Sequence, residues 1–412
     1  MTSRRKFIGK MAVAGISTQI NWFSGYQPDF ARNDWKEIRN QFPVSKSPVL
    51  NLNSGSAGSM PYPVLEELVK KTHEFNNNAL YKTKELYEND IYNAKVKLSN
   101  FLGCTPEELA LTKNTTESLS AIIWGLPLDK KDEVIFSKSD YPFLQTFIKK
   151  RSEKEGFKTN EIELDLPYSS DEDIIERYRN AINSNTKLIV VTMITHREGQ
   201  ILPVKKICQL ARENNIEVLV DAAHAPGQVF HSFRDLGCDY YTACLHKWMN
   251  GPFGTGLIIV NKEKIGKLNP PAFPYPEVFQ NSIRKFDYSG TTAFQNLAVV
   301  NAVMDFNQKI DMREKEAHLK NLTAYWTEKI EGIKGAKIIT DVNRSAALSG
   351  FNIEGINLAK MKRALFEQHK INIKLTSYKR VGFFRVSTNI FTDEKDLDRF
   401  VNAVESIVVN HE

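Results

Sequence analysis

Short apolar runs and longer amphipathic segments alternate along the chain from about residue 105. The runs with the length and composition of β-strands are 108–111, 133–136, 187–191, 217–220 and 256–260. The segments with a helical spacing of apolar residues are 144–155, 174–182 and 204–214. Buried strands that alternate with helices predict an α/β fold, in which helices cover both faces of a mostly parallel sheet.

This alternation ends at a proline-rich stretch, residues 268–276, and helical segments follow to about Ile333. The elements expected after Ile333 are strands around Ile338, over 347–351 and over 383–386, and a last helix over 396–408. The pattern predicts a smaller α+β domain at the carboxyl end of the chain.

The composition is that of an ordinary globular protein, because 25% of the 412 residues are charged and 42% are hydrophobic. It excludes a disordered chain, a collagen-like repeat and a disulfide-rich miniprotein. The 55 Lys and Arg exceed the 49 Asp and Glu by 6, and these charges are spread along the chain, whereas a nucleic-acid-binding surface needs clustered ones.

The cysteines are Cys104, Cys208, Cys238 and Cys244. They form no Cys-x-x-Cys pair, so we expect no metal site and free, buried thiols.

The amino terminus resembles a twin-arginine export signal. Arg4 and Arg5 lie in a basic segment, and a mildly apolar stretch follows over residues 11–16. That stretch is too short for a permanent membrane span. We therefore expect export to the periplasm through the twin-arginine machinery and removal of the signal before about Tyr26, although an ordinary basic helix is the alternative. Removal would lower the formal charge by 4, to about +2.

The predicted strand over 217–220 ends in Asp221, and His224 follows shortly after it. Ligands bind at the carboxyl ends of the strands in an open α/β sheet, so these two side chains are candidates for a binding site. The alternative is that Asp221 only caps the following helix.

Lys247 lies in a segment of aromatic, apolar and glycine residues, 244–257. A lysine in such surroundings tends to have a lowered pKa, and its neutral amine can form a Schiff base with a carbonyl group. The alternative is a surface lysine beside a turn.

Hydroxyl groups lie at the predicted start of a helix within 111–119, at Thr115 and Thr116. Free N–H groups and hydroxyls at a helix amino terminus suit a phosphate. Simple capping of the helix is the alternative.

Together these three elements resemble the class V aminotransferase group of fold-type I pyridoxal-phosphate (PLP) enzymes, and within it the isopenicillin-N-epimerase-like branch. The resemblance runs from the string Leu-Asn-Ser-Gly-Ser-Ala-Gly at 52–58 to Phe-Arg-Val-Ser at 384–387. Its most specific part is the string His-Lys-x-x-x-Gly-Pro-x-Gly-x-Gly that begins at His246. The resemblance implies a large PLP-binding domain with a mostly parallel seven-stranded sheet and a smaller α+β carboxyl-terminal domain.

The domain boundaries expected on this basis are an export signal over 1–26, an arm over 27–58 that packs with the small domain, a large domain over 59–292 and a small domain over 293–412.

The resemblance also implies roles for individual residues. Lys247 would hold PLP as an internal aldimine and move the Cα proton, and Asp221 would pair with the pyridinium N–H. The other implied cofactor contacts are Thr115, Thr116 and His246 at the phosphate, Tyr141 stacked on the ring, His224 at the phenolic oxygen, Thr195, and Thr291 at the phosphate of the neighbouring subunit. The contact from Thr291 implies a homodimer with shared sites. Arg385 would bind the substrate carboxylate.

Three positions depart from the family pattern. Met193 replaces a commonly found His, and Cys244 takes the place of a hydroxyl or amide near the phosphate. His196 stands where related enzymes often carry Asn or Ser, and it would bind the substrate carboxylate, act as a second acid or base, or serve as a fixed hydrogen-bonding group. In addition, residues 373–380 contain no cysteine, whereas a cysteine desulfurase needs a thiolate on a mobile loop there. A persulfide mechanism is therefore disfavoured.

The resulting prediction is an exported PLP enzyme that acts on an amino acid or amino-acid derivative through a Lys247 aldimine and a Cα carbanion. Epimerisation, transamination and β-elimination by a C–S lyase use the same Lys, Asp and phosphate site, so the motifs leave them open. The branch resemblance favours epimerisation slightly, with His196 or Tyr141 as the second proton donor. A PLP-binding protein without catalysis is a further alternative, which the presence of Lys247 and Asp221 argues against.

Overall fold

The computed structural model describes residues 33–78, 82–165, 170–270, 275–287, 290, 292–378 and 380–409. Two features predicted from the sequence lie outside these residues, the twin-arginine segment and Thr291.

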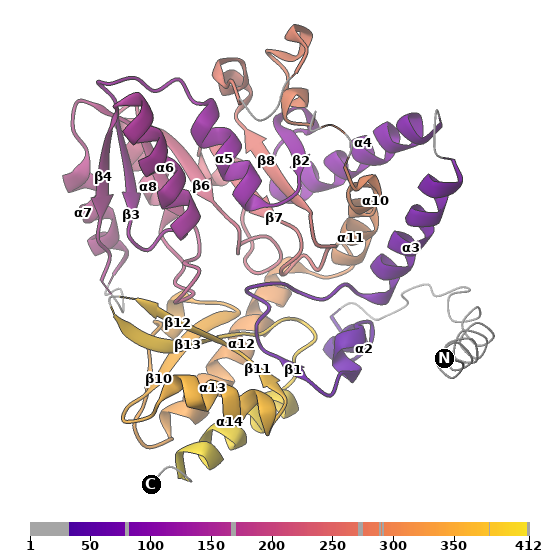
Figure 1. Cartoon of the computed structure of the whole chain (residues 1–412), viewed down its shortest axis with the longest axis vertical. Helices are drawn as coiled ribbons and strands as arrows, with labels where there is room; N and C mark the ends of the chain where they lie inside the picture. Colours follow the sequence, from indigo (N-terminus) through magenta and orange to yellow (C-terminus); the bar gives the residue numbers. More distant parts are fainter. Residues whose placement is uncertain are drawn as a thin grey trace, which may run out of the picture.

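The large sheet has seven strands in the order β2-β8-β7-β6-β5-β3-β4 (Figure 1). The strands are β2 (Leu109–Thr112), β3 (Glu133–Ser137), β4 (Lys158–Ile162), β5 (Thr186–Thr192), β6 (Glu217–Asp221), β7 (Tyr240–Cys244) and β8 (Gly256–Val260). Only β8 is antiparallel to its neighbours, β2 and β7, and the pairs from β7 to β4 are parallel. The predicted, mostly parallel α/β sheet is confirmed.

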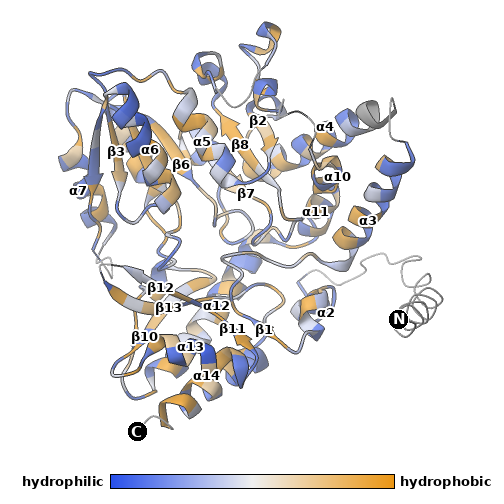
Figure 2. Ribbon diagram, in the orientation of Figure 1, coloured by the Kyte–Doolittle hydropathy of each residue, from blue (hydrophilic) through white to orange (hydrophobic). Residues whose placement is uncertain are grey.

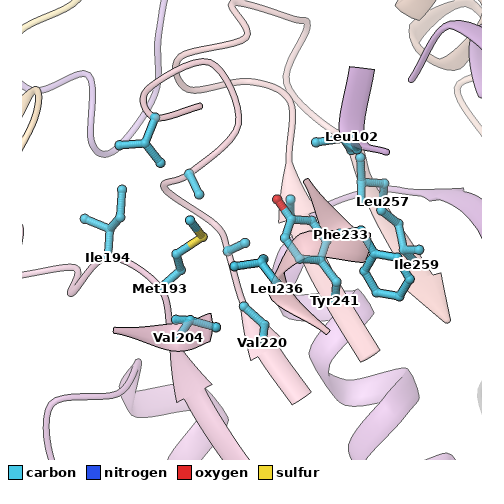
Figure 3. Packing of buried hydrophobic residues seen from close by; sticks show 14 of the residues in the cluster. Leu102, Met193, Ile194, Val204, Val220, Phe233, Leu236, Tyr241, Leu257 and Ile259 are labelled. Atoms are coloured by element: carbon cyan, nitrogen blue, oxygen red, sulfur yellow. The ribbon is translucent and has the colours of Figure 1, made fainter. Parts of the chain in front are cut away.

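Both faces of this sheet are buried, because successive strand residues are apolar. Within β3, Ile135 belongs to one core cluster, whereas Val134 and Phe136 belong to the other. The first cluster includes residues of α4 (Lys82–Leu102), α7 (Asp171–Ala181) and α8 (Val204–Glu213), and the second includes residues of α5 (Thr115–Gly125) and α6 (Pro142–Glu155). Figure 3 shows part of the first cluster, in which Tyr241 and Met193 are labelled.

Two of the seven strands were not predicted from local pattern. The strand β4, with the sequence Lys-Thr-Asn-Glu-Ile, pairs only with β3 at the edge of the sheet, and it is mostly polar and exposed. The strand β7 is fully buried and carries aromatic and small residues just before the Lys247 segment.

The remaining elements of the large domain flank the sheet. They are α2 (Trp35–Asn40), α3 (Tyr62–Asn77), α9 (Phe233–Leu236), α10 (Phe294–Ala298) and α11 (Val300–Asn307), with short 3-10 helices at Pro43–Lys46, Pro106–Glu108, Lys262–Lys267, Glu277–Phe279 and Ile283–Phe286. The helices α10 and α11 contact α3 and α4, although they follow the predicted boundary at residue 292. The domain boundaries stay predictions. No helix among the described residues has the length and apolar character to cross a membrane.

The smaller domain has a four-stranded antiparallel sheet in the order β12-β13-β10-β9. Its elements are α12 (Met312–Glu331), β9 (Ala336–Ile338), a 3-10 helix (Val342–Arg344), β10 (Leu348–Ile353), α13 (Leu358–Glu367), β11 (Ile371–Asn372), β12 (Lys374–Tyr378), β13 (Val381–Ser387) and α14 (Glu394–Val409). Helices α12, α13 and α14 contribute apolar residues to its core. In Figure 2 both orange, hydrophobic and blue, hydrophilic residues appear along α14. The short strand β1 (Leu50–Asn51) pairs with β11, so the amino-terminal part of the chain joins this domain.

The predicted smaller α+β domain is confirmed, with one difference in its elements. The stretch 373–380, which the sequence analysis compares with a mobile catalytic loop, contains β12 as far as Tyr378. The mostly polar sequence Lys-Leu-Thr-Ser-Tyr agrees with the position of β12 at the edge of the small sheet.

Candidate active site

The candidate site lies at the edge of the large sheet that faces the small domain. The ends of β2, β5, β6 and β7 and the start of β8 meet at this edge. Hydrogen bonds cross to the small domain here, because Trp248 Nε1 donates to the carbonyl of Thr388 over 3.0 Å and Arg385 Nη1 donates to the carbonyl of His196 over 2.8 Å. The large and small domains therefore both contribute to the site.

Lys247 lies in the turn after β7, and its amine faces His224. The Lys247 Nζ is 3.0 Å from the His224 Nε2. The lysine backbone is held by a close approach of the amino-terminal segment, since the N–H of Gly58 donates to the carbonyl of His246 over 2.7 Å. A side chain at Gly58 would put its Cβ only 2.1 Å from the carbonyl oxygen of Lys247.

Asp221 and His224 both act on this amine, His224 by direct contact and Asp221 through its charge. Asp221 is 2% exposed, and its Oδ1 accepts the N–H of Ala223 over 3.0 Å. Burial raises the pKa of Asp221, and the Ala223 N–H and Lys247 oppose this rise. Burial and then Lys247 hold the pKa of His224 well below its usual value, so its imidazole is neutral. Burial also lowers the pKa of Lys247, against the opposing effect of Cys244 and Asp221.

An anion site lies at the start of α5. Asn114 caps this helix and accepts the N–H of Glu117 over 2.9 Å, and the first backbone bond runs from Ser118 to Asn114. The N–H groups of Thr115 and Thr116 thus precede the first intrahelical bond. The Thr115 side chain is 6% exposed, and its hydroxyl has no hydrogen-bond partner in the described structure.

Gly256 and Cys244 close this anion site from the next strands. A Cβ at Gly256 would lie 2.7 Å from the Cα of Asn114, so only glycine lets β8 approach the helix start. The Cys244 thiol donates to the carbonyl of Ala223 over 3.1 Å. Although burial raises the pKa of Cys244, Lys247 and His246 outweigh it and lower the pKa below the usual value. Burial lowers the pKa of His246, but Cys244 outweighs it and raises the pKa above its usual value.

These residues fit a pyridoxal phosphate molecule. The orphaned Thr115 hydroxyl and the free N–H groups of α5 suit its phosphate. The buried carboxyl of Asp221 suits its ring nitrogen, and the amine of Lys247 suits its carbonyl carbon.

Arg385 lies in β13 and is 3% exposed. Its Nη2 donates to Asn53 Oδ1 over 2.7 Å and to Ser56 Oγ over 3.0 Å, and its Nε has no partner in the described structure. All these acceptors are neutral oxygens. Burial lowers the pKa of Arg385 to about 10, so the side chain stays charged at neutral pH. Among the described residues, the site therefore contains a buried cation without a counter-ion.

His196 and Tyr141 lie together beside Arg385. Their rings meet edge to face, with centroids 5.5 Å apart. The Nδ1 of His196 is buried without a partner, and burial, then Arg197 and Arg385, hold the pKa of its imidazole well below the usual value.

Two residues near His196, Thr195 and Met193, make contacts that stabilise the fold. The hydroxyl of Thr195 accepts the N–H of Gln200 over 3.0 Å, inside the loop after β5. Met193, where related enzymes commonly carry His, is 6% exposed and packs in the hydrophobic core (Figure 3). The cofactor contact of Thr195 stays a prediction, as do the roles of the other site residues.

Some residues of the site were not singled out from the sequence. Asn53 and Ser56 belong to the 52–58 string, and their role needed the contact with Arg385 to become visible. Asp140 is fully buried and accepts the N–H and the hydroxyl of Thr192, over 3.2 and 2.6 Å, which fixes the turn that presents Tyr141. Its position directly before Tyr141 was the only signal in the sequence.

Comparisons with known proteins agree with this geometry. The family model described as aminotransferase class-V matches residues 49–400. Isopenicillin N epimerase of Amycolatopsis lactamdurans is 24% identical over 394 residues, which cover 90% of this chain and 98% of that protein. The apo structure of a cysteine desulfurase from Thermococcus onnurineus NA1 has a TM-score of 0.81 at 18% identity and covers 93% of this chain and 99% of its own.

A second similar structure is a C-DES variant with glycine covalently linked to its PLP cofactor. Its TM-score is 0.80 at 19% identity, and the match covers 89% of this chain and 98% of that chain. The expected fold type is thereby confirmed, as is the cofactor. The chain belongs to the class-V aminotransferase family and is a PLP-dependent enzyme.

Proposed function

We propose that this enzyme inverts the configuration at Cα of an amino acid or amino-acid derivative. The observation that carries the proposal is the placement of the Lys247 amine, 3.0 Å from His224, in one site with a buried arginine that has no counter-ion. Bound PLP supplies an electron sink that makes the Cα–H bond acidic.

Arg385 holds the α-carboxylate of the substrate. Its guanidinium is rigidly placed by Asn53 and Ser56, and its Nε is still free to donate. A planar guanidinium binds a carboxylate with better directionality than an ammonium group does. This contact orients Cα toward the amine of Lys247.

Lys247 and His196 carry the proton on the two sides of Cα. The lowered pKa of Lys247 favours the neutral amine that can accept the Cα proton, and a hydrogen bond of 3.0 Å with His224 holds that amine in place. His196 comes from the loop after β5, and its buried Nδ1 is without a partner, so it is available to a proton from the other side. Because its pKa lies well below the usual value, the imidazole of His196 is neutral and takes the proton of the enantiomer whose Cα–H faces it. The imidazolium that this forms returns a proton to Cα in the reverse direction.

The test is incubation of the holoenzyme in deuterated water with single enantiomers of a panel of amino acids. Deuterium at Cα together with loss of optical purity supports the proposal. An oxo-acid product identifies an aminotransferase, and ammonia with pyruvate identifies a β-lyase. If either of these is the main reaction, the proposed inversion at Cα is wrong.

The variant His196→Asn sharpens this test. Inversion should slow by about 100-fold or more, because a second acid–base group is lost. Exchange of the Cα hydrogen with retention should persist through Lys247. If inversion and exchange fall in parallel, His196 is not the second proton carrier.

We further propose that the enzyme is a homodimer in which Thr291 reaches the phosphate of the neighbouring subunit. The family string at 288–292 supports this proposal. Light scattering of the purified holoenzyme should give twice the chain mass of 47.0 kDa. A monomer that retains full cofactor affinity would rule it out.

Export to the periplasm remains part of the proposal and rests on Arg4 and Arg5. Cell fractionation should find the wild-type protein outside the cytoplasm. The double variant Arg4→Lys/Arg5→Lys should stay inside, and an unchanged location would refute the export signal.

A further inference from the structure

Lys374 lies beside Arg385 on the small-domain face of the site. The two residues are register partners in the antiparallel pair β12–β13. Directly opposed residues project from the same face of a sheet. The next pair along, Leu375 and Phe384, belongs to the core of the small domain, so Lys374 and Arg385 project from the other face.

A third cation, Arg197, approaches the same face from the large domain. It follows His196, whose carbonyl accepts a hydrogen bond from Arg385. The guanidinium of Arg197 is 5.7 Å from the centroid of the Tyr378 ring. Tyr378 is four positions after Lys374 in β12, so the two side chains share a face.

In the part of the chain that the structure describes, neither Lys374 nor Arg197 nor Arg385 forms an ion pair with a carboxylate. Glu198 is on the same loop as Arg197, but it is fully buried, and burial raises the pKa of its carboxyl.

Such an arrangement favours the binding of an anion, and the cost of leaving it without one falls mainly on the buried Arg385. Like charges directly opposite one another destabilise a sheet, and an uncompensated buried cation costs more. The electrostatic influence of Lys374 extends into the site, because burial, then Arg385 and then Lys247, lower its pKa. A single α-carboxylate would neutralise Arg385 and would leave Lys374 and Arg197 without a counter-ion.

We propose that the substrate carries a second anionic group on its side chain, which Lys374 binds with Arg197 beside it while Arg385 binds the α-carboxylate. This inference rests on the proposed function for the position of the α-carboxylate. It narrows the substrate class to acidic amino acids and their derivatives. Lys374 is largely exposed, so an incoming substrate can reach it from solvent.

The experiment compares the binding of two unreactive ligands to the holoenzyme by calorimetry. Glutarate has two carboxylates, and valerate has the same chain length with one. Glutarate should bind about tenfold more tightly or better, because a hydrogen-bonded charge pair contributes about 1.5–3 kcal/mol. A second comparison, of O-phosphoserine with serine, measures by how much a phosphate at the second position increases the affinity. This gain is then set against the gain from the second carboxylate of glutarate.

Variants of Lys374 assign the preference to this residue. Lys374→Gln should abolish most of the preference for glutarate, and Lys374→Arg should keep it. Lys337→Gln is the matched control, because Lys337 is exposed in β9 at the opposite edge of the same sheet. The control should keep the preference, which shows that net charge alone is not the cause.

Equal binding of glutarate and valerate, or a preference that survives in Lys374→Gln, overturns this inference. The outcome is separate from that of the proposed function. If neutral amino acids lose optical purity at Cα and no dianion preference exists, the proposed function stands and only the second anion site falls. If no amino acid exchanges its Cα hydrogen but glutarate still binds through Lys374, the proposed function falls and the second anion site stands.

Discussion

The Nζ of Lys247 lies 3.0 Å from the Nε2 of His224, within the electrostatic influence of the buried carboxyl of Asp221. Burial and then Lys247 keep the imidazole of His224 neutral, and its tautomer decides which of the two nitrogens donates in this contact. The pair therefore holds the lysine in place without neutralising it by an ion pair, which suits an amine that must react with a carbonyl carbon.

Replacement of Asp221 by Asn should remove the negative charge and keep the fold. The Asn oxygen can still accept the Ala223 N–H, which now bonds over 3.0 Å. Activity should fall by about 100-fold or more, because a preorganised charge beside the ring nitrogen is lost. Steady-state kinetics measures the loss, and thermal unfolding measures stability. Asp235→Asn, at an exposed position of α9, is the control with full activity. An Asp221→Asn enzyme with wild-type activity would contradict the assigned role.

Replacement of Thr115 by Val should weaken binding of the cofactor. The hydroxyl has no partner in the described structure, so the apoprotein should lose little stability. The dissociation constant of PLP should rise by about 10- to 100-fold, because a hydrogen bond to a charged phosphate is lost. Fluorescence titration of the apoprotein measures this constant.

Thr112→Val provides the contrast for Thr115. The Thr112 hydroxyl shares a buried hydrogen bond of 2.7 Å with Ser118. Its loss should lower the free energy of unfolding by about 1 kcal/mol and leave the PLP affinity nearly unchanged. If both variants lose the same affinity, the Thr115 hydroxyl is no direct phosphate ligand.

Replacement of Arg385 by Lys should raise the KM for the amino-acid substrate by about 10- to 100-fold, since the charge remains but the planar fork is lost. The affinity for PLP should stay unchanged, because Arg385 faces the substrate. Initial rates at varied substrate concentration give KM and kcat separately. Arg363→Lys, on the exposed side of α13, serves as the control. A loss of PLP affinity equal to the rise in KM would show that Arg385 supports the cofactor instead.

Lys315 predicts a pH dependence of stability. It is fully buried in α12, and its Nζ donates to the carbonyl of Trp248 over 2.8 Å and to Asn307 Oδ1 over 3.3 Å. Burial lowers its pKa to about 7. Between about pH 7 and its unfolded pKa of about 10.4, the unfolded chain binds a proton that the folded chain does not. The free energy of unfolding therefore rises with pH between about pH 7 and about pH 10.4. Above about pH 10.4 Lys315 is neutral in both states, and below about pH 7 the folded protein carries the full cost of its buried charge.

Lys315→Met removes this titration. The stability of the wild type relative to Lys315→Met should rise by roughly a few kcal/mol from about pH 7 to about pH 10. Urea unfolding at several pH values measures the difference, and titrations common to both proteins cancel. Parallel pH profiles would show that Lys315 is charged in the folded protein.

The sequence predicted those parts of the fold and site that depend on local pattern. Strands buried on both faces, such as β5 and β6, appear as continuous apolar runs. The edge strands β4 and β12 are partly polar, and their strand conformation depends on neighbours far along the chain, so the local pattern missed them.

The candidate site shows the same division. Asp221, His224 and Lys247 were predicted because each follows a strand or belongs to a specific string, and the structure brings them together. The pairing of Lys374 with Arg385 depends on strand register, which the ten intervening residues, 375–384, do not reveal. Met193 is the opposite case. It was singled out from the sequence as a departure from a family motif, but its side chain packs in the hydrophobic core.

The most direct test of the central claim is to locate the covalent attachment of the cofactor. Borohydride reduction of the holoenzyme fixes PLP to the amine that holds it, and mass spectrometry of the digest identifies the lysine. The account predicts a pyridoxyl group on Lys247 and none in Lys247→Ala, whereas the exposed-lysine control Lys113→Ala should be labelled as the wild type is. A label on another lysine, or a holoenzyme that carries none, would contradict it.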